Sequence, residues 1–285
     1  MISGVDKPSE LEVDAVHFSS IVLRILCHSE QWSMQIVTLD PKIELMRVLD
    51  EEYRQRSGLR DRRFYSIFYS RIPPAPLMIL GINPGGNPET WNLPPGTDEF
   101  CTTWQHEYVD QRYRIQTVMQ PLLKRVLGID DQILRRIPKT NMVFRRSEGA
   151  SKFVAQQGGM TLWQGLEESA PTLARIVRRV SPRAIIFEGH DALAMFNHAF
   201  GVAPLSPSLV KPFTTANGRY PALVYAVHEV ATSLLPHTIL SFSLAHPSKF
   251  GQRLEYRTAE QDMKIRLTPI ASAVREVGPP PQTSL

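Results

Sequence analysis

The sequence is poor in cysteine and contains no long apolar run. Its 285 residues include two cysteines, too few for a disulfide scaffold or a four-cysteine metal or iron–sulfur site. No stretch of about 18 apolar residues occurs, so we expect no transmembrane helix. The first eleven residues carry Asp6, Lys7 and Glu10 and lack the apolar core of a signal peptide. These absences favour a protein of the reducing cytoplasm that binds no membrane.

Several catalytic signatures are missing as well. The sequence has no Gly-Lys-Ser/Thr phosphate loop, no Gly-x-Ser-x-Gly turn and no cluster of His, Asp and Glu with convincing metal-ligand spacing. We therefore expect neither a metal nor another cofactor. The charge is mildly basic, and the excess lies in residues 73–285, where 22 Lys and Arg face 17 Asp and Glu. Such a balance is compatible with a polyanionic partner without demanding one.

Strands and helices alternate from residue 77 onwards. Residues 77–82 form an apolar run between two prolines and the turn sequence Asn-Pro-Gly-Gly, a pattern typical of a strand buried on both faces. The pattern predicts further strands at 140–144, 184–187 and 239–245, an accessory strand at 222–227, and helices at 113–127, 161–180 (interrupted by Pro171), 192–200 and 254–275. We expect an α/β fold, a doubly wound α/β/α sandwich with a mainly parallel four-stranded central sheet.

The chain is expected to divide into three parts. Residues 1–72 are predicted to form an N-terminal helical extension, with a helix at 41–53 and an apolar stretch at 16–26 that fits either a helix or a strand. Residues 73–277 are predicted to form a catalytic domain. Residues 278–285 contain three consecutive prolines, which predict a disordered tail.

Three of the predicted strands end in polar or turn residues. Asn83 follows the first strand, Asn141 lies in the second, and His246-Pro247-Ser248 follows the last. Open α/β sheets bind ligands at the carboxyl ends of their strands. We therefore expect two amides and an imidazole at one sheet edge, which make a hydrogen-bonding pocket rather than a nucleophilic triad.

These stretches resemble the uracil-DNA glycosylase superfamily, most of all its mismatch-specific and single-strand-selective branches. Gly81-Ile82-Asn83-Pro84-Gly85 is similar to the water-activating motif, and His246-Pro247-Ser248 to the start of the loop that enters the minor groove. Thr140-Asn141-Met142-Val143 is similar to the strand whose asparagine reads the flipped base. The resemblance covers roughly residues 75–255. It implies a monomeric DNA glycosylase acting on double- or single-stranded DNA, and a monofunctional one, because no lysine stands at a recognised nucleophile position.

The resemblance also implies roles for single residues. The catalytic candidates are Asn83, which would hold the attacking water, and His246, which would donate to the base oxygen that gains charge. The base-binding candidates are Asn141, Phe100, Gly85 and Ile82, with Trp91 and Trp104 as alternatives to Phe100 for stacking on the base. The DNA-binding candidates are Ser248, Lys249, Phe250 (as an apolar wedge) and Arg253. Each also has an ordinary structural alternative, such as turn capping by Asn83.

One departure from the family bears on the substrate. The uracil-specific branch has a tyrosine two residues after the water-activating residue, which blocks the pyrimidine 5-position, whereas this chain has Gly85 there. A roomier pocket would admit a 5-substituted pyrimidine: an oxidised thymine or cytosine, or a hypermodified phage cytosine whose removal would serve antiviral defence. Three alternatives stay open: a uracil or mismatch repair glycosylase, a non-catalytic module that binds modified bases in DNA, and an α/β enzyme that acts on free nucleotides.

Overall fold

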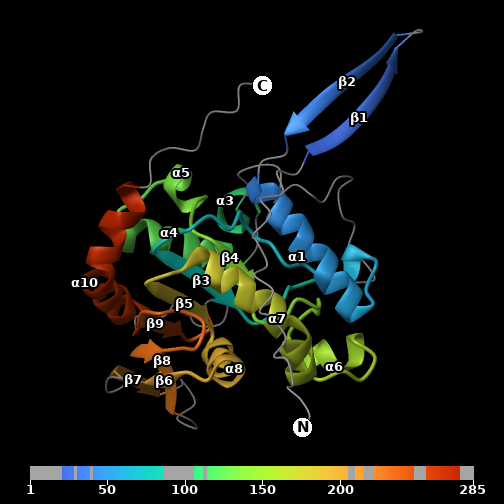
Figure 1. Ribbon diagram of the computed structural model, residues 1–285. Coiled ribbons are helices and arrows are strands. Elements are labelled where there is room, and N and C mark those ends of the chain that lie inside the picture. The colour runs from blue at the N-terminus through green and yellow to red at the C-terminus, as the bar shows by residue number, and fades with distance from the viewer. Residues whose placement is uncertain are drawn as a thin grey trace, which may run out of the picture. The chain divides into compact units, whose positions relative to one another are not determined.

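The computed structural model describes residues 21–28, 31–38, 41–86, 106–111, 114–204, 209–214, 221–246 and 255–276 (Figure 1). The chain divides into a small unit, Met1–Glu44, and a large unit, Leu45–Leu285. In the small unit, β1 (Ile21–His28) and β2 (Gln31–Thr38) pair as an antiparallel hairpin. The large unit thus begins upstream of residue 73, where we placed the start of the catalytic domain.

Four parallel strands form the centre of the large unit. They lie side by side in the order β4 (Lys139–Asn141), β3 (Leu77–Gly81), β5 (Ala184–Glu188) and β9 (Ile239–Leu244). This arrangement confirms an α/β fold. Every residue of β3 and β5 is buried, as expected for strands covered on both faces.

Within the described residues the sheet has seven strands and is wider than predicted. β8 (Pro221–Ala231) pairs antiparallel with β9, and β6 (Ala203–Pro204) and β7 (Leu209–Thr214) both pair antiparallel with β8. β6 and β7 lie in a stretch rich in proline, glycine and threonine, which are typical of loops, so the sequence did not predict them as strands. Both nevertheless pair with the long β8.

Helices cover both faces of the sheet (Figure 1). On one face, α1 (Pro41–Ser57), α7 (Leu162–Val180) and α8 (His190–Phe200) share a core with Met78 and Leu80. On the other face, α4 (Gln116–Leu127) and α10 (Glu255–Glu276) share a core with Leu77 and Ile79. Successive side chains of a strand point to opposite faces, so the apolar run of β3 contributes to both cores.

Helix ends follow local capping chemistry. The Thr161 side chain accepts a hydrogen bond from the Gln164 backbone in a capping box at the start of α7, and α4 ends at Gly128 with φ 62°. α7 continues through Pro171, where we expected an interruption; this proline is exposed. The shorter helical segments are α3 (Glu107–Asp110), α5 (Asp131–Leu134), α6 (Phe153–Gln156), η1 (Arg62–Phe64) and η2 (Ala150–Lys152).

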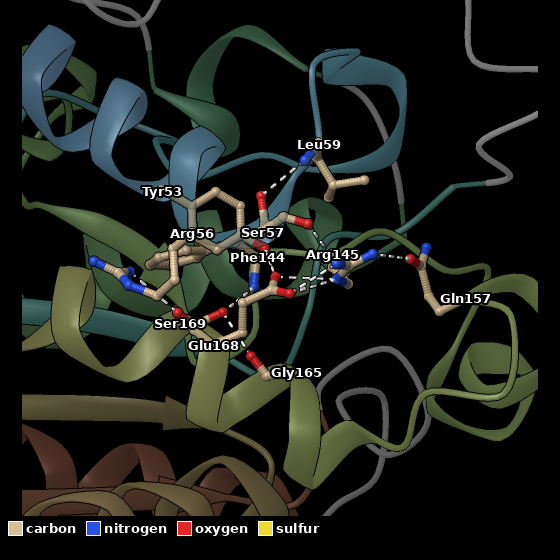
Figure 2. A network of polar contacts seen from close by, with 10 residues as sticks. All are labelled: Tyr53, Arg56, Ser57, Leu59, Phe144, Arg145, Gln157, Gly165, Glu168 and Ser169. Atoms are coloured by element: carbon tan, nitrogen blue, oxygen red, sulfur yellow. Dashed lines mark hydrogen bonds and ion pairs between the residues drawn. The ribbon is translucent and has the colours of Figure 1, made fainter.

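A network of polar contacts joins α1 and α7 to the segment that follows β4 (Figure 2). The Glu168 carboxylate accepts a hydrogen bond from the Tyr53 hydroxyl at 2.5 Å and pairs with the Arg145 guanidinium at 2.7 Å. Arg145 also donates to the backbone carbonyl of Ser57 at 3.2 Å. Burial, reinforced by Glu168, raises the pKa of Tyr53, so its hydroxyl stays a donor. The network fixes the start of the 145–147 segment, which leads to the candidate site.

Candidate functional site

The carboxyl ends of the four parallel strands meet at one edge of the sheet. Gly81 of β3 pairs with Asn141 of β4, and Glu188 of β5 pairs with Leu244 of β9. Leu80 pairs with Phe187, so Gly81 and Glu188 also stand at the same level on neighbouring strands. Asn83 and His246 follow β3 and β9 by two residues each.

The side-chain amide of Asn83 is held in one orientation. Its Nδ2 donates to Ser147 Oγ at 2.8 Å and to the Pro84 carbonyl at 3.0 Å. Ser147 Oγ in turn donates to the Gly149 carbonyl at 3.0 Å, and the Ser147 backbone N–H donates to the Pro84 carbonyl at 3.0 Å. No described residue donates to Asn83 Oδ1. The half-buried amide therefore has an acceptor oxygen that no described residue uses.

Asn141 and Glu188 converge over Gly81. A Cβ added at Gly81 would overlap Asn141 Oδ1 and would lie 2.8 Å from Glu188 Oε2. Only glycine leaves room for an amide and a carboxyl at this point. Asn141 is 4% exposed, and in the described part of the chain its side chain makes no hydrogen bond. The amide thus retains its capacity for donating and accepting.

A buried lysine connects the carboxyl of Glu188 to a second carboxyl. Lys139 Nζ lies 2.7 Å from Glu188 Oε2 and 2.9 Å from Glu107 Oε2, and all three residues are buried. The ammonium also lies over the rings of Tyr69 and Tyr108, 5.6 and 5.0 Å from their centroids. We call Lys139, Glu107 and Glu188 the charged cluster.

Burial has the largest effect on the pKa values of the three residues in the charged cluster. It raises the pKa of Glu107 and raises that of Glu188 well above the ordinary value, with the Glu107 carboxylate adding to the effect at Glu188. Burial lowers the pKa of Lys139, and the Glu107 carboxylate opposes this. Two carboxyls around one ammonium therefore hold a proton more readily than an isolated carboxyl does.

His106 holds α3 in the position that brings Glu107 to Lys139. His106 Nδ1 accepts a hydrogen bond from the Tyr108 backbone N–H at 3.0 Å, so the ring proton lies on Nε2 and points to the Ile137 carbonyl, 3.1 Å away. Burial, together with the nearby Lys139 ammonium, lowers the pKa of His106 to about 3. The ring is neutral at physiological pH, and its role in this arrangement is structural.

His246 lies next to the turn that follows β5. A Cβ added at Gly189 would lie 3.4 Å from Ile82 Cδ1 and 3.7 Å from His246 Cδ2, so these three residues are neighbours. Gly189 has φ 114°, a conformation that side-chain-bearing residues rarely adopt. It caps α8, whose first residue, His190, contacts Ser243 of β9 through Nδ1.

The structure brings together part of the predicted set. Ile82, Asn83, Asn141 and His246 lie at one sheet edge, and Gly85 is exposed nearby, with its carbonyl accepting from Arg146 Nη1 at 3.2 Å. A Cβ added at Gly85 meets no described atom within 4 Å. The other predicted positions, Phe100, Trp91, Trp104, Ser248, Lys249, Phe250, Arg253 and the tail 278–285, lie outside the described residues.

Sequence reasoning missed Ser147 and the charged cluster. Glu188 carries the same signal as Asn83 and Asn141, a polar residue at the end of an apolar strand, and the strand-end rule could have identified it. Glu107 and Lys139 carry no such local signal. Their contacts depend on the packing of α3 against the sheet edge.

The comparisons with known proteins add no relative. No protein-family model matches the chain, and no curated protein matches its sequence. Among the residues that the structure describes, no group of three His, Cys, Asp or Glu side chains is placed to hold a metal ion. No helix within these residues is both long and apolar enough to cross a membrane. The resemblance to the uracil-DNA glycosylase superfamily rests on its motifs.

Proposed function

We propose that this chain is a monofunctional DNA glycosylase that extrudes a 5-substituted pyrimidine and hydrolyses its N-glycosidic bond, leaving an abasic site. The observation that carries the proposal is the meeting of three motif residues at one sheet edge. Asn83 follows Ile82, Asn141 pairs with Gly81, and His246 lies beside Gly189 and Ile82. The three come from segments far apart in the sequence.

The strand order supports a ligand site at this edge. The chain passes from β3 outward to β4 and then crosses back to β5 on the other side of β3. In a doubly wound α/β/α sandwich such a reversal is a topological switch point, and ligands bind outside the carboxyl ends of the strands there. At this point Asn83 follows β3, Asn141 ends β4 and Glu188 ends β5.

In the proposed reaction Asn83 positions the attacking water. The water oxygen bonds to C1′ while the bond from C1′ to the base nitrogen breaks. The base leaves with the bonding electrons, the water loses one proton to become the C1′ hydroxyl, and the base takes up one proton in exchange. Asn83 Oδ1 accepts a hydrogen bond from the water because Nδ2 is already held by Ser147 and Pro84. An amide is too weak a base to remove the proton, so its contribution is orientation.

His246 and Asn141 act on the base. An imidazole N–H of His246 donates to the base oxygen that gains negative charge, which stabilises the leaving group. The Asn141 amide provides one donor group and one acceptor to the Watson–Crick edge. DNA is the proposed partner, and the remaining residues that we assign to it belong to 87–105 and 247–254, which lie outside the described residues.

Open space at Gly85 supports a substrate with a 5-substituent. Gly85 takes the place of the tyrosine that blocks the 5-position in the uracil-specific branch, and no described atom lies within 4 Å of a Cβ added there. A substituent at this position of the pyrimidine therefore meets no barrier from the 82–86 turn. Oxidised or hypermodified bases fit this requirement, and removal of a hypermodified phage base serves antiviral defence.

Base release from DNA tests the proposal directly. The full-length protein is incubated with duplexes that each contain one uracil, 5-hydroxymethyluracil or 5-hydroxymethylcytosine, and with modified phage DNA, and released bases are identified by mass spectrometry. We expect release of 5-substituted bases by the wild type and a loss of about 100-fold or more in Asn83→Ala, because positioning of the water is lost. Thr268→Ala, at an exposed position of α10, serves as the matched control and should act as the wild type.

Two other outcomes would reject the proposal. Binding to modified DNA without release of any base would instead identify a non-catalytic module that recognises modified bases. Activity on mononucleotides that does not fall with salt would indicate an enzyme of free nucleotides, because binding to a DNA duplex weakens steeply as salt rises. Release of uracil alone would reject the 5-substituted substrate and leave a uracil repair glycosylase.

A further inference from the structure

The carboxyl of Glu188 lies beside the amide that is assigned to base recognition. Glu188 Oε2 and Asn141 Oδ1 both approach the point where a Gly81 side chain would begin. Glu188 ends β5 and stands at the level of Gly81 on the neighbouring strand. A base that reaches Asn141 therefore also comes within reach of Glu188.

One oxygen of this carboxyl has no partner. Glu188 Oε2 accepts a hydrogen bond from Lys139 Nζ at 2.7 Å, whereas Oε1 is buried and makes no hydrogen bond with any described residue. Glu188 is 3% exposed. Buried polar atoms in folded proteins nearly always have partners, and an unsatisfied one costs about 1–3 kcal/mol. The unpartnered Oε1 belongs to the carboxyl whose Oε2 approaches the Asn141 amide. A carboxyl with an unused acceptor, beside an amide without a partner among the described residues, indicates a ligand that brings N–H groups.

We propose that Glu188 is a specificity-determining residue that accepts a hydrogen bond from the exocyclic amine at position 4 of the extruded base. The substrate class then becomes cytosine-type bases with a 5-substituent rather than uracil-type bases. This inference rests on the proposed glycosylase function and deepens it. Neither Glu188 nor its partner Lys139 is among the three motif residues whose meeting carries that function.

The donor and acceptor pattern of the two base classes supports this choice. A cytosine-type base has an amine at position 4 and an acceptor at N3, whereas a uracil-type base has a carbonyl oxygen at position 4 and a donor at N3. Carboxylates accept from the cytosine amine, and an amide N–H can donate to N3. Asn141 Oδ1 is the amide atom next to Gly81, which leaves Nδ2 for N3. A uracil-type O4 would instead face the oxygen of Glu188, and two acceptors repel each other.

A matched pair of substrates isolates position 4. Duplexes with one 5-hydroxymethylcytosine or one 5-hydroxymethyluracil differ at the Watson–Crick edge and share the 5-substituent. We measure base release by mass spectrometry and duplex affinity by fluorescence anisotropy for the wild type, Glu188→Gln and Glu260→Gln. Glu260→Gln is the matched control, because it makes the same change of carboxyl to amide in the ion pair with Arg125, and Glu260 does not approach Gly81.

The expected result is a shift in selectivity confined to one variant. The wild type should prefer the cytosine-type base, and Glu188→Gln should reduce that preference about tenfold, since a glutamine N–H can donate to O4. Glu260→Gln should leave the preference within about twofold. Glu188→Asp, which retains a carboxyl, should keep the direction of the preference if Glu188→Gln does not fold, as judged by thermal unfolding.

Three results would overturn the inference. They are a wild-type preference for the uracil-type base, an unchanged preference in Glu188→Gln, and an equal change in Glu260→Gln. Failure of the proposed function is seen separately, as no base release from any DNA. In that case affinity decides: a preference for the cytosine-type duplex that Glu188→Gln abolishes supports recognition without catalysis, and equal affinities reject the inference.

Discussion

Gly81→Ala is the most direct test of the geometry at the sheet edge. The substitution adds one methyl group at the point where Asn141 and Glu188 converge. The new Cβ would overlap Asn141 Oδ1 and would lie 2.8 Å from Glu188 Oε2, whereas ordinary van der Waals contact begins near 3.4 Å. The backbone of Gly81 does not have the positive φ that disfavours alanine, so the effect comes from crowding alone.

The expected effect of Gly81→Ala follows from the displacement of the Asn141 amide. The Asn141 amide must be displaced by about 1 Å, and overpacking of a buried site by one methyl group costs roughly 1–3 kcal/mol. We expect a loss of about 2 kcal/mol in the free energy of unfolding, measured by urea titration. A displacement of about 1 Å at a positioning residue lowers catalytic rates by about 100-fold, so base release should fall by that factor.

Gly85→Ala provides the control for this prediction. A Cβ at Gly85 meets no described atom within 4 Å, and its φ is not positive either. We expect its free energy of unfolding to stay within about 0.5 kcal/mol of the wild type. If Gly81→Ala is as stable and as active as Gly85→Ala, then Asn141 and Glu188 do not converge over Gly81, and the site that we describe is wrong.

Three further predictions concern the neighbours of this point. Ser147→Ala removes the hydroxyl that holds Asn83, and steady-state kinetics should show kcat about tenfold lower with KM little changed. Lys139→Met leaves two buried carboxyls without their cation, and urea titration should show a loss of about 3–5 kcal/mol. Because the pKa of Glu188 is raised by burial and by Glu107, its carboxyl loses its proton only as pH rises past the ordinary value. The preference for 5-hydroxymethylcytosine over 5-hydroxymethyluracil should therefore increase with pH, and a flat profile in wild type would count against the acceptor role.

Much of the central sheet was predictable because its strands carry strong local signals. Residues 77–82 are apolar and lie between prolines and a turn, and the strand itself is Leu77–Gly81. The outer strands were not predictable in this way, since β6 and β7 lie in a segment rich in loop-forming residues and pair only because β8 offers an edge. The position of α1 also escaped prediction, because its packing on Met78 and Leu80 joins residues separated by long stretches of sequence.

The candidate site was predictable where it depends on strand ends. Asn83, Asn141 and His246 follow from one rule about parallel sheets and from short motifs. The charged cluster does not, because Lys139 precedes Asn141 in the same strand and its partners come from α3 and β5. Lysine is rarely buried, so a lysine beside a predicted buried strand suggests that the strand begins after it, and not that the lysine has a function.

The location of the charged cluster argues for a function of this sheet edge that does not depend on the family resemblance. Buried ion pairs often contribute less stability than well-packed apolar side chains of the same volume. Lys139 pairs in register with Ile79. The other strand residues on that face of the sheet include Leu77 and Ile186. Apolar side chains at this position would stabilise the fold, yet the residue there is a lysine whose ammonium contacts Glu188 at the end of β5. Such local losses of stability are expected at functional sites. Because Glu188 retains one unpartnered oxygen among the described residues, the cluster is better explained as support for a recognition carboxyl than as a closed structural ion pair.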